Sequence, residues 1–158
     1  MASNRTRAVL LVLAGGLVAG TLDITYACVF WAIKAGAPPA RIFQSVARGL
    51  LGAASFRGGA ATAALGLFLH YFIATTMSFV YYFAALKWAT LHNHPFRCGV
   101  VYGLGLYLVM TYVVVPLSAA GGGSGPQDKL WIGLSIFVHM FLIGLPIALF
   151  TRRAIASN

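Results

Sequence analysis

The chain is almost free of acidic residues, with two Asp or Glu side chains among 158 residues against eleven Lys or Arg. This scarcity excludes a catalytic mechanism that needs two carboxylates in one site. Charged residues of both signs make up 8% of the sequence, far below the roughly 25% of an ordinary soluble domain. Hydrophobic side chains make up 60%, and the mean hydropathy is +0.87. This composition indicates an integral membrane protein.

Several sequence patterns that would identify an activity are also missing. We find no Gly-x-Ser-x-Gly nucleophile motif, nucleotide-binding loop, zinc-finger spacing or internal repeat. The net charge of +9 could suit nucleic acid, but the basic residues stand at the ends of apolar segments, as the flanks of membrane spans do. The sequence therefore favours neither a nucleic-acid partner nor an enzyme.

Four apolar segments are long enough to cross a bilayer, which takes ~20 residues for ~30 Å of hydrocarbon. They cover residues 8–33, 60–86, 99–120 and 130–150. The first is too long for the hydrophobic part of a cleaved signal peptide, which has about 7–15 residues, and it contains an aspartate. We therefore predict an all-α fold, a four-helix transmembrane bundle that forms one domain over residues 1–158, with a glycine-rich turn at 121–126.

The segment 39–51, between the first two spans, is predicted to form an amphipathic helix. Pro38 and Pro39 suit a helix start, where a missing N–H costs nothing. One face of the helical wheel is apolar and carries Ile42, Phe43, Val46, Ala47 and Leu50. The opposite face carries Arg41, Gln44, Ser45 and Arg48. We expect this helix to lie along the membrane interface with Arg41 and Arg48 toward the lipid headgroups. The alternatives are a lid over the bundle and a docking face for a partner subunit.

Each span carries one polar or metal-favouring side chain at a similar depth: Asp23, His70, Met110 and His139. With a helical rise of ~1.5 Å per residue, all four come to roughly 12–17 Å from the same membrane face, close to the middle of the bilayer. Gly16 and Gly20 share a helix face with Asp23, so this face should be approached closely by another helix. We therefore expect Asp23, His70 and His139 to converge inside the bundle.

The same side chains allow several roles. A carboxylate in hydrocarbon must be neutral, hydrated or paired, and a histidine is its natural partner. The simplest interpretation is a structural hydrogen-bond cluster of Asp23 with His70 or His139. The functional alternatives are a transition-metal ion held by His70, His139, Asp23 and Met110, a haem with the two histidines as axial ligands, and a proton relay. Met110 alone is more typical of packing.

Orientation and partners follow from composition and charge. Lys and Arg flanking the spans slightly favour both termini in the cytoplasm. The bilayer is then the surrounding partner. The leading hypothesis is a small membrane protein that binds a metal or haem or relays protons at the polar layer. The rival is an accessory subunit that packs against a larger membrane complex or against its own copies.

Short motifs along nearly the whole chain resemble a group of small bacterial inner-membrane proteins of unknown function, loosely similar to YagU-like proteins. They are Gly-Thr-Leu-Asp at 20–23, Arg-Ile-Phe-Gln-Ser at 41–45, Gly-Leu-Phe-Leu-His-Tyr at 66–71, Val-Pro-Leu-Ser at 115–118 and Gly-Leu-Pro-Ile-Ala at 144–148. The resemblance implies a four-span fold in the bacterial inner membrane and agrees with the choice of Asp23, His70 and His139, but it implies no particular activity.

Overall fold

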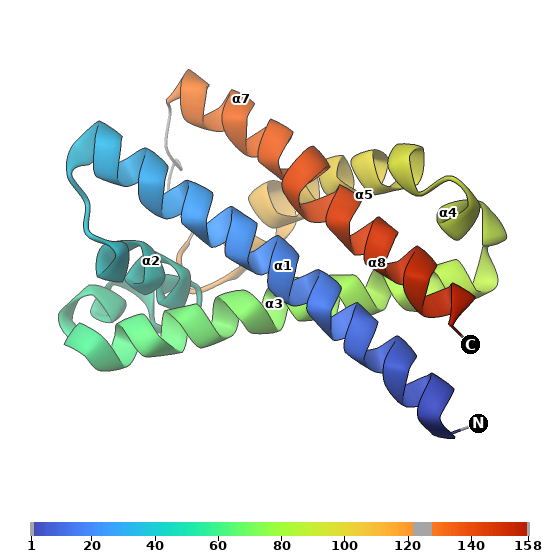
Figure 1. Ribbon diagram of the computed structural model, residues 1–158. Helices are drawn as coiled ribbons and strands as arrows, with labels where there is room; N and C mark the ends of the chain where they lie inside the picture. The colour runs from blue at the N-terminus through green and yellow to red at the C-terminus, as the bar shows by residue number, and fades with distance from the viewer. Residues whose placement is uncertain (1, 122–127, 158) are drawn as a thin grey trace.

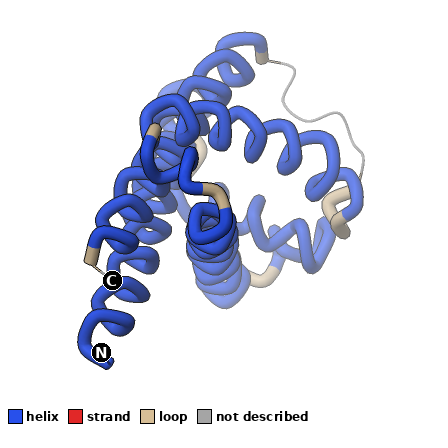
Figure 2. Tube along the Cα trace, turned by 90° about the vertical axis from the view of Figure 1, so that its right-hand side faces the viewer, coloured by secondary structure: helices blue, strands red, loops and turns tan. Residues whose placement is uncertain are grey.

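The computed structural model describes residues 2–121 and 128–157, which form helices and short connections with no strand (Figures 1 and 2). Four helices are long and apolar enough to cross a membrane, at Asn4–Ala35, Gly59–Lys87, Pro95–Leu117 and Lys129–Ala156. The predicted all-α four-helix architecture is therefore confirmed. Most of the predicted turn, residues 122–126, lies outside the described residues.

The first two spans are continuous helices, and the last two are each built from three helical segments. The elements are α1 (Ala2–Ala35), α2 (Pro39–Leu51), the 3₁₀ helix η1 (Gly52–Arg57), α3 (Gly59–Lys87), α4 (Ala89–Asn93), α5 (Pro95–Val109), the π-helix η2 (Met110–Val114), α6 (Val115–Leu117), α7 (Lys129–Val138), the π-helix η3 (His139–Gly144) and α8 (Leu145–Ala156). The third span starts and ends a few residues earlier than predicted, and the fourth continues past the apolar run through Arg152 and Arg153. Helix ends follow Pro95 and backbone geometry rather than the limits of hydrophobicity.

Small residues allow the spans to pack closely. Gly16 lies against Thr75 of α3, and Gly15 lies against Phe150 of α8, so that added Cβ atoms would stand 2.6 Å and 2.8 Å from these neighbours. Between the third and fourth spans, Gly103 faces the backbone of η3 with no room for a side chain. Helices in lipid have no hydrophobic driving force to associate, so close packing at such glycines stabilises the bundle instead. Many large apolar side chains remain exposed on the outside, as expected for a surface that faces hydrocarbon.

The two ends of the bundle are different. Both chain termini and α4 lie at one end, and α2 lies at the other (Figure 1). At the α2 end, α1 and α7 are joined by an ion pair between Lys34 and Asp128, with 2.8 Å between Nζ and Oδ2. Asp128 also caps α7 by accepting hydrogen bonds from the backbone N–H groups of Leu130 and Trp131. This ion pair uses one of the two acids of the chain, and Asp23 is the other.

The helix α2 has the bounds predicted from the wheel, but its polar side is not uniformly exposed. Gln44, which the wheel places on the polar face, is buried against α3 and donates to the carbonyl oxygen of Gly59 at 3.0 Å. Leu50 of the predicted apolar face is 60% exposed. Gly66 of α3 is in tight contact with the backbone of Phe43. Thus α2 is fixed to α3 by backbone contact, and a helical wheel does not reveal this contact.

Candidate functional site

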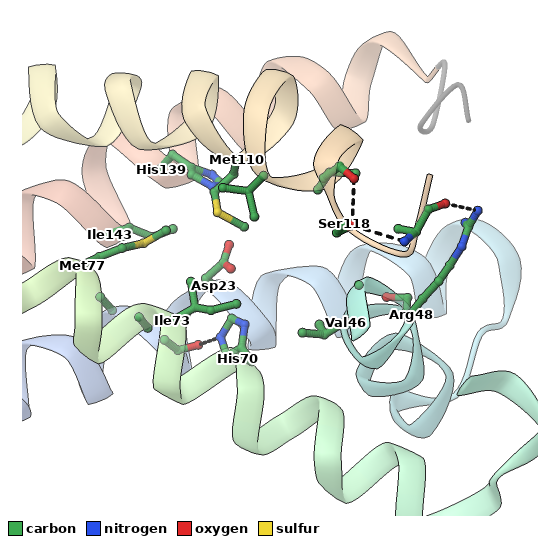
Figure 3. A pocket seen from close by; sticks show the side chains of 18 of the residues that line it. Asp23, Val46, Arg48, His70, Ile73, Met77, Met110, Ser118, His139 and Ile143 are labelled. Carbon is green, nitrogen blue, oxygen red and sulfur yellow. Dashed lines mark hydrogen bonds between the residues drawn. The ribbon is translucent and has the colours of Figure 1, made fainter. Parts of the chain in front are cut away.

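The four side chains of the predicted polar layer line one pocket between the spans. The pocket has a volume of about 430 Å³, within the ~300–1,000 Å³ that is typical of small-ligand sites. Asp23 comes from α1, His70 from α3, Met110 from η2 and His139 from η3. Figure 3 shows the Asp23 carboxyl between His70 on one side and His139 with Met110 on the other. The structure therefore brings Asp23, His70, His139 and Met110 to one cavity.

Each histidine has one ring nitrogen held by a backbone carbonyl. His70 donates from Nε2 to the carbonyl oxygen of Gly20 on α1, at 2.8 Å. His139 donates from Nδ1 to the carbonyl oxygen of Ser135, one turn earlier in its own span, also at 2.8 Å. Because a carbonyl can only accept, these bonds place the proton on the bonded nitrogen of each neutral ring. The other nitrogen of each ring, Nδ1 of His70 and Nε2 of His139, is then left as an acceptor.

Asp23 differs from both histidines because its position is not fixed by a hydrogen bond. The side chain is half-buried, and within residues 2–121 and 128–157 no protein group donates a hydrogen bond to it. Gly20 is one turn before Asp23 on α1 and packs against Tyr71 and Ala74 of α3. This close approach explains why His70 of α3 reaches the Gly20 carbonyl and shares a pocket with Asp23. The carboxyl faces a cavity rather than a dedicated partner.

Two of the four side chains stand at the start of π-helical segments. Met110 begins η2 and His139 begins η3. A proline follows each segment within two residues, at Pro116 and Pro146. Proline has no backbone N–H and its ring clashes with the carbonyl four residues earlier, so a locally widened helix accommodates it. The sequence alone predicts kinks at these prolines, but it does not reveal that the π-helices begin at pocket residues.

In the ranges 2–121 and 128–157, no three His, Cys, Asp or Glu side chains lie close enough together to hold one ion. The ligand set proposed from the sequence, His70, His139 and Asp23 with Met110, therefore shares a cavity without the convergence that metal–nitrogen bonds of ~2 Å demand. Helical rise predicts the depth of these side chains in the membrane but not the distances between their ligand atoms. Direct coordination would require the spans to move closer.

The pocket extends from this layer to the end of the bundle at α2. The residues there, Ser45, Arg48, Gly49, Ser118 and Ala120, are called the Arg48 end below. Arg48 donates from Nη2 to the carbonyl oxygen of Ala120 at 2.9 Å, and the Ala119 N–H donates to the Gly49 carbonyl at 2.9 Å. At the opposite end of the pocket in Figure 3 are Met77 and Ile143. The pocket therefore joins an apolar interior to a polar end.

Arg41 and Arg48, which the sequence assigned to one role, have different surroundings. Arg41 is exposed, and its guanidinium carbon lies 4.1 Å from the centre of the Phe56 ring. Arg48 is also exposed, but it lines the pocket and links α2 to the segment after α6. The link spans 72 positions in the sequence, so no local pattern could have predicted it.

Comparisons with protein-family models, with curated proteins and with solved structures give no match.

Proposed function

We propose that the protein is a small multi-pass protein of a bacterial inner membrane whose pocket takes up and releases protons at Asp23, with His70 and His139 as neighbouring proton carriers. The observation that carries this proposal is the shared pocket of the only carboxyl side chain in the four spans and two imidazoles with fixed tautomers. A carboxylate in hydrocarbon is costly, and a proton or a charged imidazole beside it lowers that cost.

The path for the proton starts at the Arg48 end, where Arg48 is exposed. From there a proton reaches Asp23 through the cavity and is shared with the acceptor nitrogen of His70 or His139. At the other end, Met77 and Ile143 offer no protonatable group. The proposed site is therefore open to protons from one membrane face.

Metal binding is the second candidate, because metal-ligating histidines commonly donate their other ring N–H to a backbone carbonyl. His70 and His139 both do so. This candidate requires a closer approach of the ligands than the described residues have. Elemental analysis and an absorption spectrum of the purified protein distinguish it: a stoichiometric transition metal or a haem band would favour a metal or haem role over proton exchange.

The rival function, an accessory subunit, has less support from the packing. The glycines that could have received a partner helix, Gly15, Gly16 and Gly20, contact α3 and α8 of the same chain. A stable monomer in native electrophoresis after mild solubilisation would argue further against this rival. The orientation, with both termini in the cytoplasm, and the YagU-like relationship remain part of the proposal, and reporter fusions at each terminus test the orientation.

Infrared titration tests the proton-exchange proposal directly. With Asp128→Asn, Asp23 is the only carboxyl side chain left in the protein, so the side-chain band of protonated acid belongs to it. We expect this band to change with pH and its midpoint to move when His70 or His139 is replaced by Gln. An Asp23 band that is unaffected by either replacement would contradict the proposal.

A further inference from the structure

The positive charge of Arg48 has no acidic counterpart in the protein. The chain has two acidic side chains: Asp128 is paired with Lys34, and Asp23 stands in the layer with the histidines. Within residues 2–121 and 128–157, the guanidinium of Arg48 makes one hydrogen bond, to the Ala120 carbonyl, although guanidinium carries five N–H donors. The lining of the pocket thus has an excess of positive charge at the Arg48 end, which an anion from outside the chain would neutralise.

The wall of the pocket beside Arg48 is apolar and faces outward. Val114 and Val115 line the pocket and are also 40% and 43% exposed. Of the segments that carry them, η2 packs on α5 and α6 packs on η2, and neither packs extensively on α1 or α3. Val46 of α2 adds apolar surface from the other side. A cationic end followed by an apolar cavity beside an outward-facing wall matches a molecule with an anionic head and a hydrocarbon chain.

We propose that this pocket binds an anionic phospholipid, with its phosphate on Arg48 and an acyl chain between α2 and the η2–α6 wall. Arginine suits phosphate because its planar N–H groups form paired, charge-assisted hydrogen bonds. The chain would fill the apolar space next to Val46, Val114 and Val115. Free phosphate would neutralise the charge but leave the apolar space empty, and a neutral lipid would fill the apolar space but leave the charge unpaired. An anionic phospholipid does both, and the surrounding bilayer supplies it.

A lipid in this position would also affect the proposed proton site. Its chain would lie between the Arg48 end and Asp23, on the path by which protons are proposed to enter. Bound lipid would therefore slow proton exchange at Asp23. This consequence depends on the proposed function, whereas the binding of the lipid does not. Asp23→Asn separates the two ideas, because it removes the proton site and leaves Arg48 and the apolar wall unchanged.

The test compares two arginines on the same helix. Dioleoyl phosphatidylglycerol is titrated into the detergent-solubilised protein, and native mass spectrometry gives the dissociation constant of the first bound lipid. Arg48→Gln should weaken binding about tenfold or more, as expected for the loss of a charge-assisted hydrogen bond. The control is Arg41→Gln, since Arg41 stacks on Phe56 outside the pocket, and it should bind like the unmodified protein.

Further arms identify the head group and the chain. Arg48→Lys should bind more tightly than Arg48→Gln, because it keeps the charge, and less tightly than the unmodified protein, because it loses the paired N–H groups. An intermediate affinity also excludes misfolding as the cause of the loss. Val115→Trp should weaken binding because the larger side chain would occupy the apolar space of the pocket, whereas Asp23→Asn should not weaken binding. Equal affinities for the Arg48→Gln and Arg41→Gln variants would overturn the proposal. So would equally tight binding of dioleoyl phosphatidylcholine, or displacement of the lipid by inorganic phosphate at similar concentration.

Discussion

Replacement of Gly103 by Ala tests the contact that positions His139. A Cβ atom at Gly103 would lie 2.7 Å from Cα of Met140 and closer still to the carbonyl of His139. Real Cβ atoms keep at least about 3.0 Å from such neighbours, and these neighbours are backbone atoms that cannot rotate away. The third and fourth spans must therefore separate by several tenths of an ångström or more, and η3 moves with them.

The expected loss can be isolated with a matched glycine on the same helix. Overpacking of this kind costs typically ~1–3 kcal/mol. Ala also raises helix propensity over Gly by ~0.5–1 kcal/mol, which partly offsets the loss. A Cβ atom added at Gly105 would have no neighbour within 4 Å, so Gly105→Ala gains the same propensity without the clash. The difference in unfolding free energy between the two variants should be about 1–3 kcal/mol.

Reversible unfolding in mixed micelles, followed by circular dichroism, measures this difference. We expect Gly105→Ala to be as stable as the unmodified protein or more stable, and Gly103→Ala to be clearly less stable than Gly105→Ala. Two variants of equal stability would refute the argument, because they would mean that the third and fourth spans do not approach as closely as Gly103 indicates.

Two further predictions concern polar groups. Ser78 is fully buried and donates to the Val12 carbonyl at 2.8 Å, so Ser78→Ala should lower stability by ~0.6–2 kcal/mol. Thr151→Val should keep or raise stability, because the buried Thr151 hydroxyl has no hydrogen-bond partner in the part of the chain that the structure describes. Thermal melts that rank the two variants in the opposite order would count against this packing. The hydrogen bond from Lys34, with those from the Trp131 and Leu130 N–H groups, holds the pKa of Asp128 below its usual 3.8. This ion pair therefore stabilises the fold above pH 3.8, and the stabilisation disappears as the pH falls through the lowered pKa. Asp128→Asn should therefore lower the melting temperature at neutral pH and have less effect in acid, and an equal effect at both pH values would contradict the assignment.

The sequence predicted those parts of the structure that depend on composition and helical rise. Long runs without charge defined the four spans, and the rise per residue placed Asp23, His70, Met110 and His139 at one depth, where they line one pocket. The glycines before Asp23 correctly indicated close packing on that face.

What the sequence could not give depends on contacts between distant segments. The burial of Gln44 depends on its bond to the Gly59 carbonyl, and the position of Arg48 depends on its bond to the Ala120 carbonyl. A helical wheel of the α2 segment includes neither Gly59 nor Ala120. The π-helices at Met110 and His139 depend on how each span adjusts to a proline further along. Ligand-atom separations depend on helix rotation, so the metal hypothesis could not be judged from depth.

Cysteine accessibility along α3 tests most directly whether the pocket joins the Asp23 layer to the Arg48 end. The measurement places single cysteines at Ile73, which lines the pocket, and at Phe72, which is 57% exposed on the outer surface, after Cys28 and Cys98 are replaced by Ser. In phosphatidylcholine vesicles, a membrane-impermeant thiol reagent added at the α2 face should label position 73 and leave position 72, which faces hydrocarbon, unlabelled. If position 73 is as protected as position 72, the pocket does not connect Asp23 to that face, and the proposed proton path is wrong.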